Sequence, residues 1–223
     1  ARHTIGIKIQ SGLFPGMPKP APLLEIFVYG TDFEGVHLRG GRISRGGIRH
    51  SDRRDDYRTE VLGLMKTQMV KNAIIVPDGA KGGFVVKSTA DKGASRPEVL
   101  ACYRKFIRTL LDLTDNIIGQ KTIHPVGCVM YDAADPYLVV AADKGTADFS
   151  DHANEIALDA GYWLGDAFAS GGKNGYDHKK LAITARGVWE CILHHLETTG
   201  NDKRPTNDGP SRTGSSSRIS ASG

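Results

Sequence analysis

A helix-like segment that leads into a short apolar run constrains the fold of this chain more than any other feature. From Asp55 to Asn72, apolar residues recur at helical spacing, and acidic residues precede them where negative charge suits the helix dipole. Ala73–Val76 is then typical of a buried strand, closed by Pro77. The expected apolar stripe comprises Tyr57, Val61, Leu64, Met65 and Met69. A helix that covers a buried strand predicts α/β layers.

Further strands and helices alternate along the chain. Strands are expected at Thr4–Ile9, Leu24–Tyr29, Gly35–Leu38, Phe84–Lys87 and Tyr137–Ala141. Helices are expected at Pro97–Ile118, from Ser150 as the cap to about Trp163, and at Thr184–Leu196. The alternation predicts an α/β domain, with Ile5, Ile7 and Ile9 on the buried face of the first strand.

Glycine-rich segments interrupt this pattern. Asp78–Gly83 ("DGAKGG") and Ala169–Lys180 are expected to be loops. Two Arg-Gly-Gly triplets, Arg39–Gly41 and Arg45–Gly47, lie in the arginine-rich stretch between Leu38 and Arg54. Such triplets occur in flexible segments that bind RNA, and they equally suit a folded pocket that binds a small anion. The residues alone leave both interpretations open.

Composition narrows the class of protein. The 39% hydrophobic and 24% charged residues are ordinary for a globular domain, and a net charge of +4 is too mild for a general nucleic-acid binder. Three scattered cysteines without a CxxC pair favour a reducing, cytoplasmic compartment over a disulfide framework or a zinc site. Neither a signal peptide nor a membrane span is expected. From Gly200 the chain becomes serine- and glycine-rich, which predicts a domain over residues 1–199 and a disordered tail over 200–223.

Lys81, between Ala80 and two glycines, is a candidate for chemistry. Glycines let a ligand approach the ammonium closely, and a lysine in a dry pocket can act as a base or nucleophile. An exposed turn is the commoner setting for a lone lysine of this kind. A phosphate-binding P-loop is excluded, because Gly82 follows Lys81 where that motif needs Ser or Thr.

Two more charged residues occupy comparable positions. Lys71 ends the first predicted helix, and Asp143 follows the end of a predicted buried strand. Ligands in α/β proteins gather where strands end, so two lysines and an arginine there would suit a substrate with two carboxylates. In isolation a surface lysine and an ion-paired aspartate are the commoner explanations. The eight histidines show no metal-ligand spacing, and no GxGxxG dinucleotide fingerprint is present.

Three segments taken together resemble one family. They are "RGGIRHSDRRDDYRTEVLGLMKTQMVKNAIIVPDGAKGGFV" (Arg45–Val85), "DPYLVVAADKGTADFSDHAN" (Asp135–Asn154) and "GYWLGDAFASGGKNGYDHKKLAITARGVWE" (Gly161–Glu190). In this order they are similar to amino-acid dehydrogenases of the glutamate type, and most of all to the large-subunit, NAD-specific glutamate dehydrogenase class. The resemblance runs from about Leu24 to about Leu196.

The resemblance implies a substrate-binding domain with a mixed sheet flanked by helices. It also implies the oxidative deamination of L-glutamate to 2-oxoglutarate and ammonia, with NAD as hydride acceptor. Lys81 matches the family's catalytic lysine and Asp143 its proton-exchanging aspartate, while Lys71 matches the lysine that binds the α-carboxylate. The remaining implied positions are Arg45 for the side-chain carboxylate, Gly46, Gly47 and Gly82 for the pocket wall, and Thr184 for the nicotinamide side.

The chain departs from the family after about Leu196, where a dinucleotide-binding domain is expected and the serine-rich tail begins instead. We therefore expect this chain alone to bind a dicarboxylate weakly without transferring hydride. The resemblance implies a homo-oligomer for the full-length enzyme, with a small-molecule substrate and neither nucleic acid nor membrane as partner. The alternative is an RNA-binding protein that uses the Arg-Gly-Gly triplets.

Overall fold

The computed structural model describes residues 4–71, 77–87, 93–173 and 181–200 of the 223-residue chain. The chain divides into two compact units, residues 1–175 and residues 176–223. The strands that the structure describes all belong to the first unit, and α4 (Ile183–Thr198) belongs to the second. The expected strand at 73–76 and the expected tail from 201 onward lie outside the described residues.

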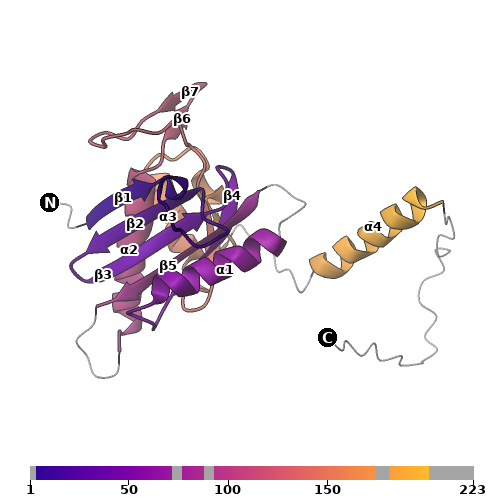
Figure 1. Ribbon diagram of the computed structural model, residues 1–223, viewed down its shortest axis with the longest axis horizontal. Helices are drawn as coiled ribbons and strands as arrows, with labels where there is room; N and C mark the ends of the chain where they lie inside the picture. Colours follow the sequence, from indigo (N-terminus) through magenta and orange to yellow (C-terminus); the bar gives the residue numbers. More distant parts are fainter. Residues whose placement is uncertain (1–3, 72–76, 88–92, 174–180, 201–223) are drawn as a thin grey trace. The chain divides into compact units, whose positions relative to one another are not determined.

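A seven-stranded mixed sheet organises the first unit (Figure 1). Its order is β1 (Thr4–Ile9), β2 (Leu24–Gly30), β3 (Phe33–Arg39), β5 (Asp78–Val86), β4 (Ser44–His50), β8 (Val139–Ala142) and β9 (Ala169–Ser170). Pairing is antiparallel from β1 to β5 and parallel from β5 to β9. The central strand β5 is thus where the two kinds of pairing meet. A hairpin of β6 (Asn116–Ile118) and β7 (Lys121–Ile123) stands apart from the sheet.

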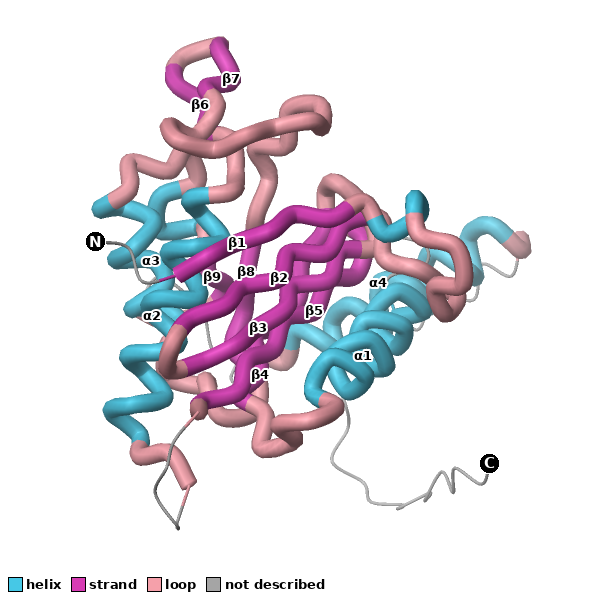
Figure 2. Tube along the Cα trace, turned by 60° about the vertical axis from the view of Figure 1, so that its left-hand side comes forward, coloured by secondary structure: helices cyan, strands magenta, loops and turns pink. Residues whose placement is uncertain are grey.

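Helices flank the sheet, which confirms the expected α/β class (Figure 2). α1 (Tyr57–Lys71) buries Tyr57, Val61 and Met65 against one face. α2 (Arg96–Asp112) and α3 (Ser150–Asp159) pack on the other face around a larger, aromatic-rich cluster. Short 3-10 turns occur at Ser11–Leu13 and Gly165–Ala167. The two hydrophobic layers hold the central strands rigidly between them.

The local sequence explains where α2 begins and ends. Ser95 and Glu98 form a reciprocal capping box, with the Ser95 backbone N–H donating to Glu98 Oε2 over 2.7 Å. Pro97 fits the first turn, where no backbone N–H is needed. The helix ends at Asp112, so the predicted continuation to Ile118 is wrong. The residues from Asn116 to Ile118 pair with β7 instead.

The largest correction concerns the segment "DGAKGG". It was expected to be a loop, yet Asp78–Val86 is one continuous strand, and it is the central strand of the sheet. The glycines are needed for packing: a Cβ on Gly79 would lie 2.6 Å from the backbone nitrogen of Met69 in α1. Close approach of a helix to a strand therefore accounts for a composition that is usual in turns.

Other predictions need smaller corrections. β4 was not expected, and it contains the second Arg-Gly-Gly triplet. Ile5 and Ile7 are exposed, because β1 turns Thr4 and Gly6 toward α2, where Thr109 donates to Thr4 Oγ1 over 3.0 Å. Ser150 is the first residue of α3 and makes no capping bond, and the helix ends at Asp159 instead of near Trp163. The remaining predicted strands and helices are confirmed with shifted ends.

The described side chains offer no metal cluster and no disulfide. Within the residues that the structure covers, no group of three or more His, Cys, Asp and Glu side chains is placed to hold a metal ion. Cys102, Cys128 and Cys191 form no disulfide, and burial raises the pKa of Cys102 to about 12. Across the described segments, no helix has both the length and the apolar character that a membrane crossing requires.

Candidate active site

The site forms where the parallel strands β5, β4 and β8 lie side by side. Gly47 of β4 lies opposite Ala141 of β8, and Ile48 lies opposite Ala142. Asp143 follows directly after β8 and therefore comes level with Arg49. On the other side of β4, Ile48 pairs with Gly82 of β5, which places Lys81 level with Gly47. The register thus puts Lys81 and Asp143 on either side of a strand that carries a glycine between them.

Lys81 and Asp143 form a close ion pair across β4. Lys81 Nζ lies 2.6 Å from Asp143 Oδ2, and the side chains are only 12% and 18% exposed. A Cβ on Gly47 would lie 3.3 Å from Lys81 Nζ and 3.0 Å from Asp143 Cβ. The lysine therefore reaches the aspartate because the intervening residue has no side chain. Two of the predicted catalytic residues are brought together by a third predicted site residue.

Arg49 holds the same carboxylate from the other side. Its Nε donates to Asp143 Oδ2 over 3.1 Å, and its Nη2 lies 3.5 Å from Oδ1. Its Nη1 donates to Glu60 of α1 over 2.9 Å, and Glu60 also accepts a 2.6 Å hydrogen bond from Ser51 Oγ. A chain of charges therefore runs from Lys81 through Asp143 and Arg49 to α1.

These contacts keep Asp143 ionised. Burial raises the pKa of its carboxyl, but hydrogen bonds from Lys81 and Arg49 outweigh burial and hold the pKa below its ordinary value. For Glu60, burial is likewise outweighed by hydrogen bonds from Ser51 and Arg49, so its pKa is also lowered. In this site two cations, from Lys81 and Arg49, alternate with two carboxylates, and all four side chains are largely shielded from water.

Thr146 fixes the backbone at this point. Its hydroxyl donates to the carbonyl oxygen of Ile48 in β4 over 2.6 Å, and it accepts from the backbone N–H of Asp143 over 3.2 Å. The backbone N–H of His50 donates to the Lys144 carbonyl over 3.1 Å. Lys144 and Thr146, which both follow Asp143, therefore tie the turn after β8 to β4 and fix the backbone position of Asp143.

Gly46 and Gly82 face the opposite side of the sheet from Lys81. Side chains alternate along a strand, so Gly46 lies opposite in direction to Gly47. A Cβ on Gly46 would overlap the carbonyl oxygen of Ala80, and one on Gly82 would lie 3.0 Å from the ring of His37. In this structure both glycines allow close packing of strands and core.

The other predicted site residues are not drawn into this cluster. Arg45 is exposed, on the same face of β4 as Gly47 and Arg49. Lys71 is exposed at the last position of α1. Thr184 belongs to α4 in the second unit, and its side chain lies outside the described residues. The substrate and nicotinamide roles of these three residues stay predictions.

Sequence reasoning missed Arg49 and Glu60. The usable signal was alternation within "SRGGIRH": in a strand, positions 45, 47 and 49 share one face. The two glycines are equally compatible with a flexible segment, so the sequence alone does not show that this alternation belongs to a strand. Glu60 lies one turn into α1, where a negative charge also suits the helix dipole, so nothing in its spacing distinguishes it.

The first Arg-Gly-Gly triplet has a structural role that cannot be assigned from the sequence alone. Arg39 is 1% exposed. It donates to Asp135 over 2.7 Å and to Ser44 Oγ over 3.2 Å. Lys8 of β1 lies 2.8 Å from the same Asp135 oxygen and 2.6 Å from Asp132. This buried network joins β1 and β3 to the segment before β8.

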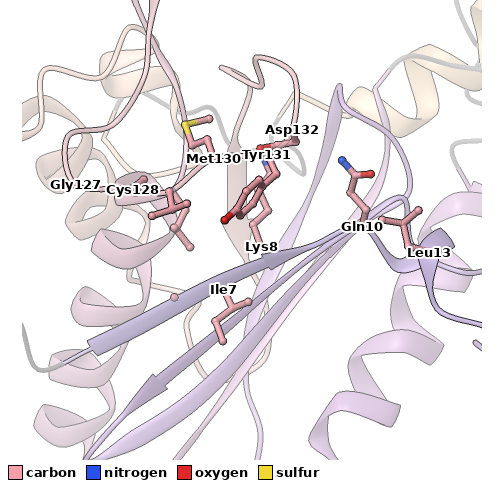
Figure 3. Close-up of a pocket in the computed structure, with 12 residues that line it drawn as sticks. Ile7, Lys8, Gln10, Leu13, Gly127, Cys128, Met130, Tyr131 and Asp132 are labelled. Atoms are coloured by element: carbon pink, nitrogen blue, oxygen red, sulfur yellow. The ribbon is translucent and has the colours of Figure 1, made fainter.

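A cavity of about 520 Å³ lies elsewhere, beside the edge strand β1 (Figure 3). Lys8, Gln10, Met130 and Asp132 are among the residues that border it. None of the predicted site residues lines this cavity. Its location on the side of the Lys8 network separates it from the Lys81–Asp143 pair, and we do not assign the chemistry to it.

The fold and site define an α/β domain in which a lysine and an ionised aspartate are held together across a glycine-bearing strand. Residues 1–208 match the family model described as bacterial NAD-glutamate dehydrogenase, catalytic domain, and the chain belongs to this family. The resemblance seen in the three sequence segments is thereby confirmed.

Individual relatives agree with the family match. The NAD-specific glutamate dehydrogenase of Halomonas elongata is 59% identical over 88% of this chain, and that of Pseudomonas aeruginosa is 55% identical over 90%. The chain spans about 12% of the length of each. Among solved structures, the leucine-bound hetero-hexameric glutamate dehydrogenase from Thermus thermophilus aligns with 86% of this chain and 40% of its own, at 16% identity and a TM-score of 0.48.

Proposed function

We propose that this chain forms the substrate half of the active site in an NAD-dependent glutamate dehydrogenase. The reaction is L-glutamate, NAD and water giving 2-oxoglutarate, ammonium, NADH and a proton. The observation that carries the proposal is the shielded Lys81–Asp143 pair, with Nζ and Oδ2 2.6 Å apart, in a chain 59% identical to an NAD-specific glutamate dehydrogenase. Because the chain spans about 12% of that relative, the other part of the active site comes from elsewhere in the enzyme.

Lys81 and Asp143 have complementary roles in the proposal. Lys81 orients and activates the water that attacks the imino carbon, and its ammonium stabilises negative charge on the carboxylates nearby. Asp143 exchanges a proton with the substrate amino group, and its lowered pKa keeps it in the accepting form at neutral pH. Their shielding from water strengthens each of these electrostatic contacts.

Two cations are proposed to bind the substrate carboxylates. Arg45 is exposed on the face of β4 that carries the site, so its guanidinium is free to meet the side-chain carboxylate bidentately. Lys71, exposed at the end of α1, is proposed to bind the α-carboxylate. Gly47 contributes by leaving the space in which Lys81 and Asp143 meet.

NAD is the hydride acceptor in the proposed reaction. The sequence carries no GxGxxG fingerprint, so the residues of this chain that would meet the cofactor are few, and Thr184 on α4 is proposed as one of them. What the described residues contribute is the binding and orientation of the amino acid and the movement of its protons. The homo-oligomeric state and the cytoplasmic location stay predictions.

The direct test replaces Lys81 in a working enzyme. In the Halomonas elongata enzyme with its matching segment exchanged for this chain, Lys81→Ala is expected to lower kcat by about 1000-fold or more, because general acid–base groups contribute on that scale. Lys87→Ala is the matched control, since Lys87 also lies beside β5 and pairs with Glu34 over 2.8 Å. Turnover by Lys81→Ala close to that of the control would overturn the proposal.

RNA binding by the Arg-Gly-Gly triplets finds no support in the structure. Arg39 is buried in an ion pair, and the second triplet forms part of a strand inside the sheet. The triplets therefore lack the extended, solvated backbone that lets such segments wrap around a nucleic acid.

A further inference from the structure

Arg49 and Glu60 are the two members of the charge chain with no part in the proposed function so far, and Arg49 is the one that contacts Asp143. It touches Asp143 through two nitrogens and Glu60 through a third, so its guanidinium bridges β8 and α1. Its side chain is 20% exposed, and α1 lies on the same side of the sheet. A planar guanidinium with three defined contacts has little rotational freedom.

We propose that Arg49 is a positioning residue that sets the orientation of the Asp143 carboxylate toward the substrate amino group. This inference rests on the proposed function. Among the side-chain donors, Lys81 and Arg49 Nε contact Oδ2 over 2.6 and 3.1 Å, whereas Oδ1 is contacted by Arg49 Nη2 at 3.5 Å. Oδ1 therefore has the weaker contacts with charged side chains, and it is the oxygen that receives the substrate proton in this proposal.

Without Arg49 the carboxylate would lose this asymmetry. Rotation about the bond to the carboxyl group is soft, so the contacts from Lys81 and the backbone N–H of Lys144 would fix the carboxylate plane less firmly without Arg49. The side-on contact of the guanidinium fixes the carboxylate plane instead. Arg49 acts on the reaction through Asp143 and is not proposed to touch the substrate.

Glu60 in turn fixes the position of the Arg49 guanidinium. Its Oε1 accepts from Arg49 Nη1, and its Oε2 accepts from Ser51 Oγ over 2.6 Å. The orientation of Asp143 is thereby tied to the position of α1, the helix that presents Lys71 at its end. A substrate that binds Lys71 and is deprotonated by Asp143 would therefore contact two groups whose relative positions are fixed by the packing of α1.

The charged groups around Asp143 determine the pKa that a titration of its carboxyl group will measure. Lys81 faces it from β5 and Arg49 from β4, and the backbone N–H of Lys144 donates to it. Behind Arg49, Glu60 of α1 is influenced by Arg53. Removing the charge of Arg49 takes away one of two cations that favour the ionised carboxylate, so the pKa of Asp143 rises.

The first experiment needs no catalysis. The carboxyl carbon of Asp143 is followed by NMR through an acid titration of this chain with Arg49 intact and as Arg49→Gln. A higher pKa and a broadened carboxyl signal in Arg49→Gln support the proposal. An unchanged pKa and an unchanged signal overturn it. Arg58→Gln is the control, because Arg58 also joins α1 to the sheet through a two-pronged contact with Glu25, at 2.7 and 2.6 Å.

The second experiment measures the consequence for turnover in the exchanged Halomonas elongata enzyme. Arg49→Gln is expected to lower kcat by about 10- to 100-fold, the scale of a misoriented catalytic group, with the KM for glutamate nearly unchanged. The acid limb of its kcat profile moves to higher pH, because Asp143 then protonates more easily. Arg49→Lys restores part of kcat, and Glu60→Gln loses less than Arg49→Gln.

The outcomes separate the two proposals. A large rise in KM with unchanged kcat would show that Arg49 binds substrate, which overturns the positioning role. Full turnover by Lys81→Ala would overturn the proposed function, whereas the NMR titration would still decide whether Arg49 controls Asp143. A loss in Arg49→Gln that Arg49→Lys does not relieve, matched by the same loss in Arg58→Gln, indicates general damage to α1 and overturns the inference.

Discussion

The two Arg-Gly-Gly triplets of this chain have the same three residues and opposite surroundings. Arg39 is 1% exposed and ion-paired with Asp135, whereas Arg45 is exposed. Arg39 ends β3 on the side of the sheet that faces α2, and Arg45 belongs to β4 on the side that carries Lys81. One triplet holds the fold together, and the other lies in the proposed site.

The difference shows that register decides what such a triplet does. Side chains alternate across a strand, so a shift of one residue exchanges the buried and exposed faces. Arg39 faces inward where a carboxylate is already buried, and it is stabilised there by pairing with Asp135. In β4 the same alternation places Arg45 and Gly47 together on the face that carries Lys81, where Gly47 lies beneath the Lys81–Asp143 pair and Arg45 is exposed.

The largest effect is expected from removing the buried arginine. Arg39→Ala should lower the free energy of unfolding by about 3 kcal/mol or more, because it leaves Asp135 buried with Lys8 as its remaining partner. Urea denaturation followed by fluorescence measures this change. Arg45→Ala is the matched control. A loss below about 1 kcal/mol for Arg39→Ala would contradict the distinction between the triplets.

The glycines of the two triplets should also differ. A Cβ on Gly46 would overlap the backbone carbonyl of Ala80, which cannot move without breaking the sheet. A Cβ on Gly41 would meet the exposed end of the Asp78 side chain, which can rotate away. We expect Gly46→Ala to cost about 1–3 kcal/mol of unfolding free energy and Gly41→Ala under about 0.5 kcal/mol. Thermal unfolding compares the two, and equal losses would refute this account.

His37 offers a further test of the buried side of β3 that faces α2, because its side chain is buried two residues before Arg39. Burial, with a smaller contribution from Arg39, lowers the pKa of His37 to about 3 from its ordinary value of 6.5. The unfolded chain therefore binds the proton more readily between those values. The free energy of unfolding should fall as the pH drops below 6.5, by up to about 1.4 kcal/mol per pH unit from this group.

His37→Leu should remove that contribution. Stability measured by urea at pH 7 and pH 5 should then differ less in the variant than in the parent chain, whatever the variant's absolute stability. A His50→Leu variant serves as a control, since His50 is partly buried and its pKa is lowered by a smaller amount. The same pH dependence in His37→Leu as in the parent would show that His37 does not titrate as described.

The smallest effect on stability is expected for Arg45. Arg45→Ala should change the free energy of unfolding by less than about 0.5 kcal/mol, as for other exposed side chains. In the exchanged enzyme it should raise the KM for glutamate by about 10-fold, because a charge-assisted contact to the substrate is lost. Steady-state kinetics with Arg42→Ala as the control measure this. An unchanged KM would remove Arg45 from the proposed site.

The alternation of helices and strands was predictable from the sequence, and the position of β4 and β5 was not. Apolar spacing identified α1, because Tyr57, Val61 and Met65 do face the core. The first part of β5, Asp78–Gly83, has the composition of a loop because its glycines lack the side chains that give a strand its alternating pattern. Those glycines exist for contacts with α1 and β4, which are tertiary and leave no local periodicity.

The candidate site was also predictable only in part from the sequence. Lys81 and Asp143 are expected to be neighbours where strands end, and the structure brings them together. The expected reason is wrong for Lys81, which lies within β5 and not beyond the end of a strand. Arg49 and Glu60 come from different elements, and only the pairing of β4 with β8 and the packing of α1 unite them. The role of Arg39 cannot be predicted from the local sequence, because its partner Asp135 is far away in the chain.

Lys81 projects from the central strand of the sheet, which is bonded to β3 along one edge and to β4 along the other. Its Cα is therefore a fixed reference point, unlike a residue on a lid that opens and closes. In the proposed reaction, the movement that brings the reacting groups together is therefore expected from the substrate or from the part of the enzyme proposed to bind NAD. The amide protons of β5 should accordingly be among the last in the first unit to exchange with solvent, in the free and the ligand-bound protein alike.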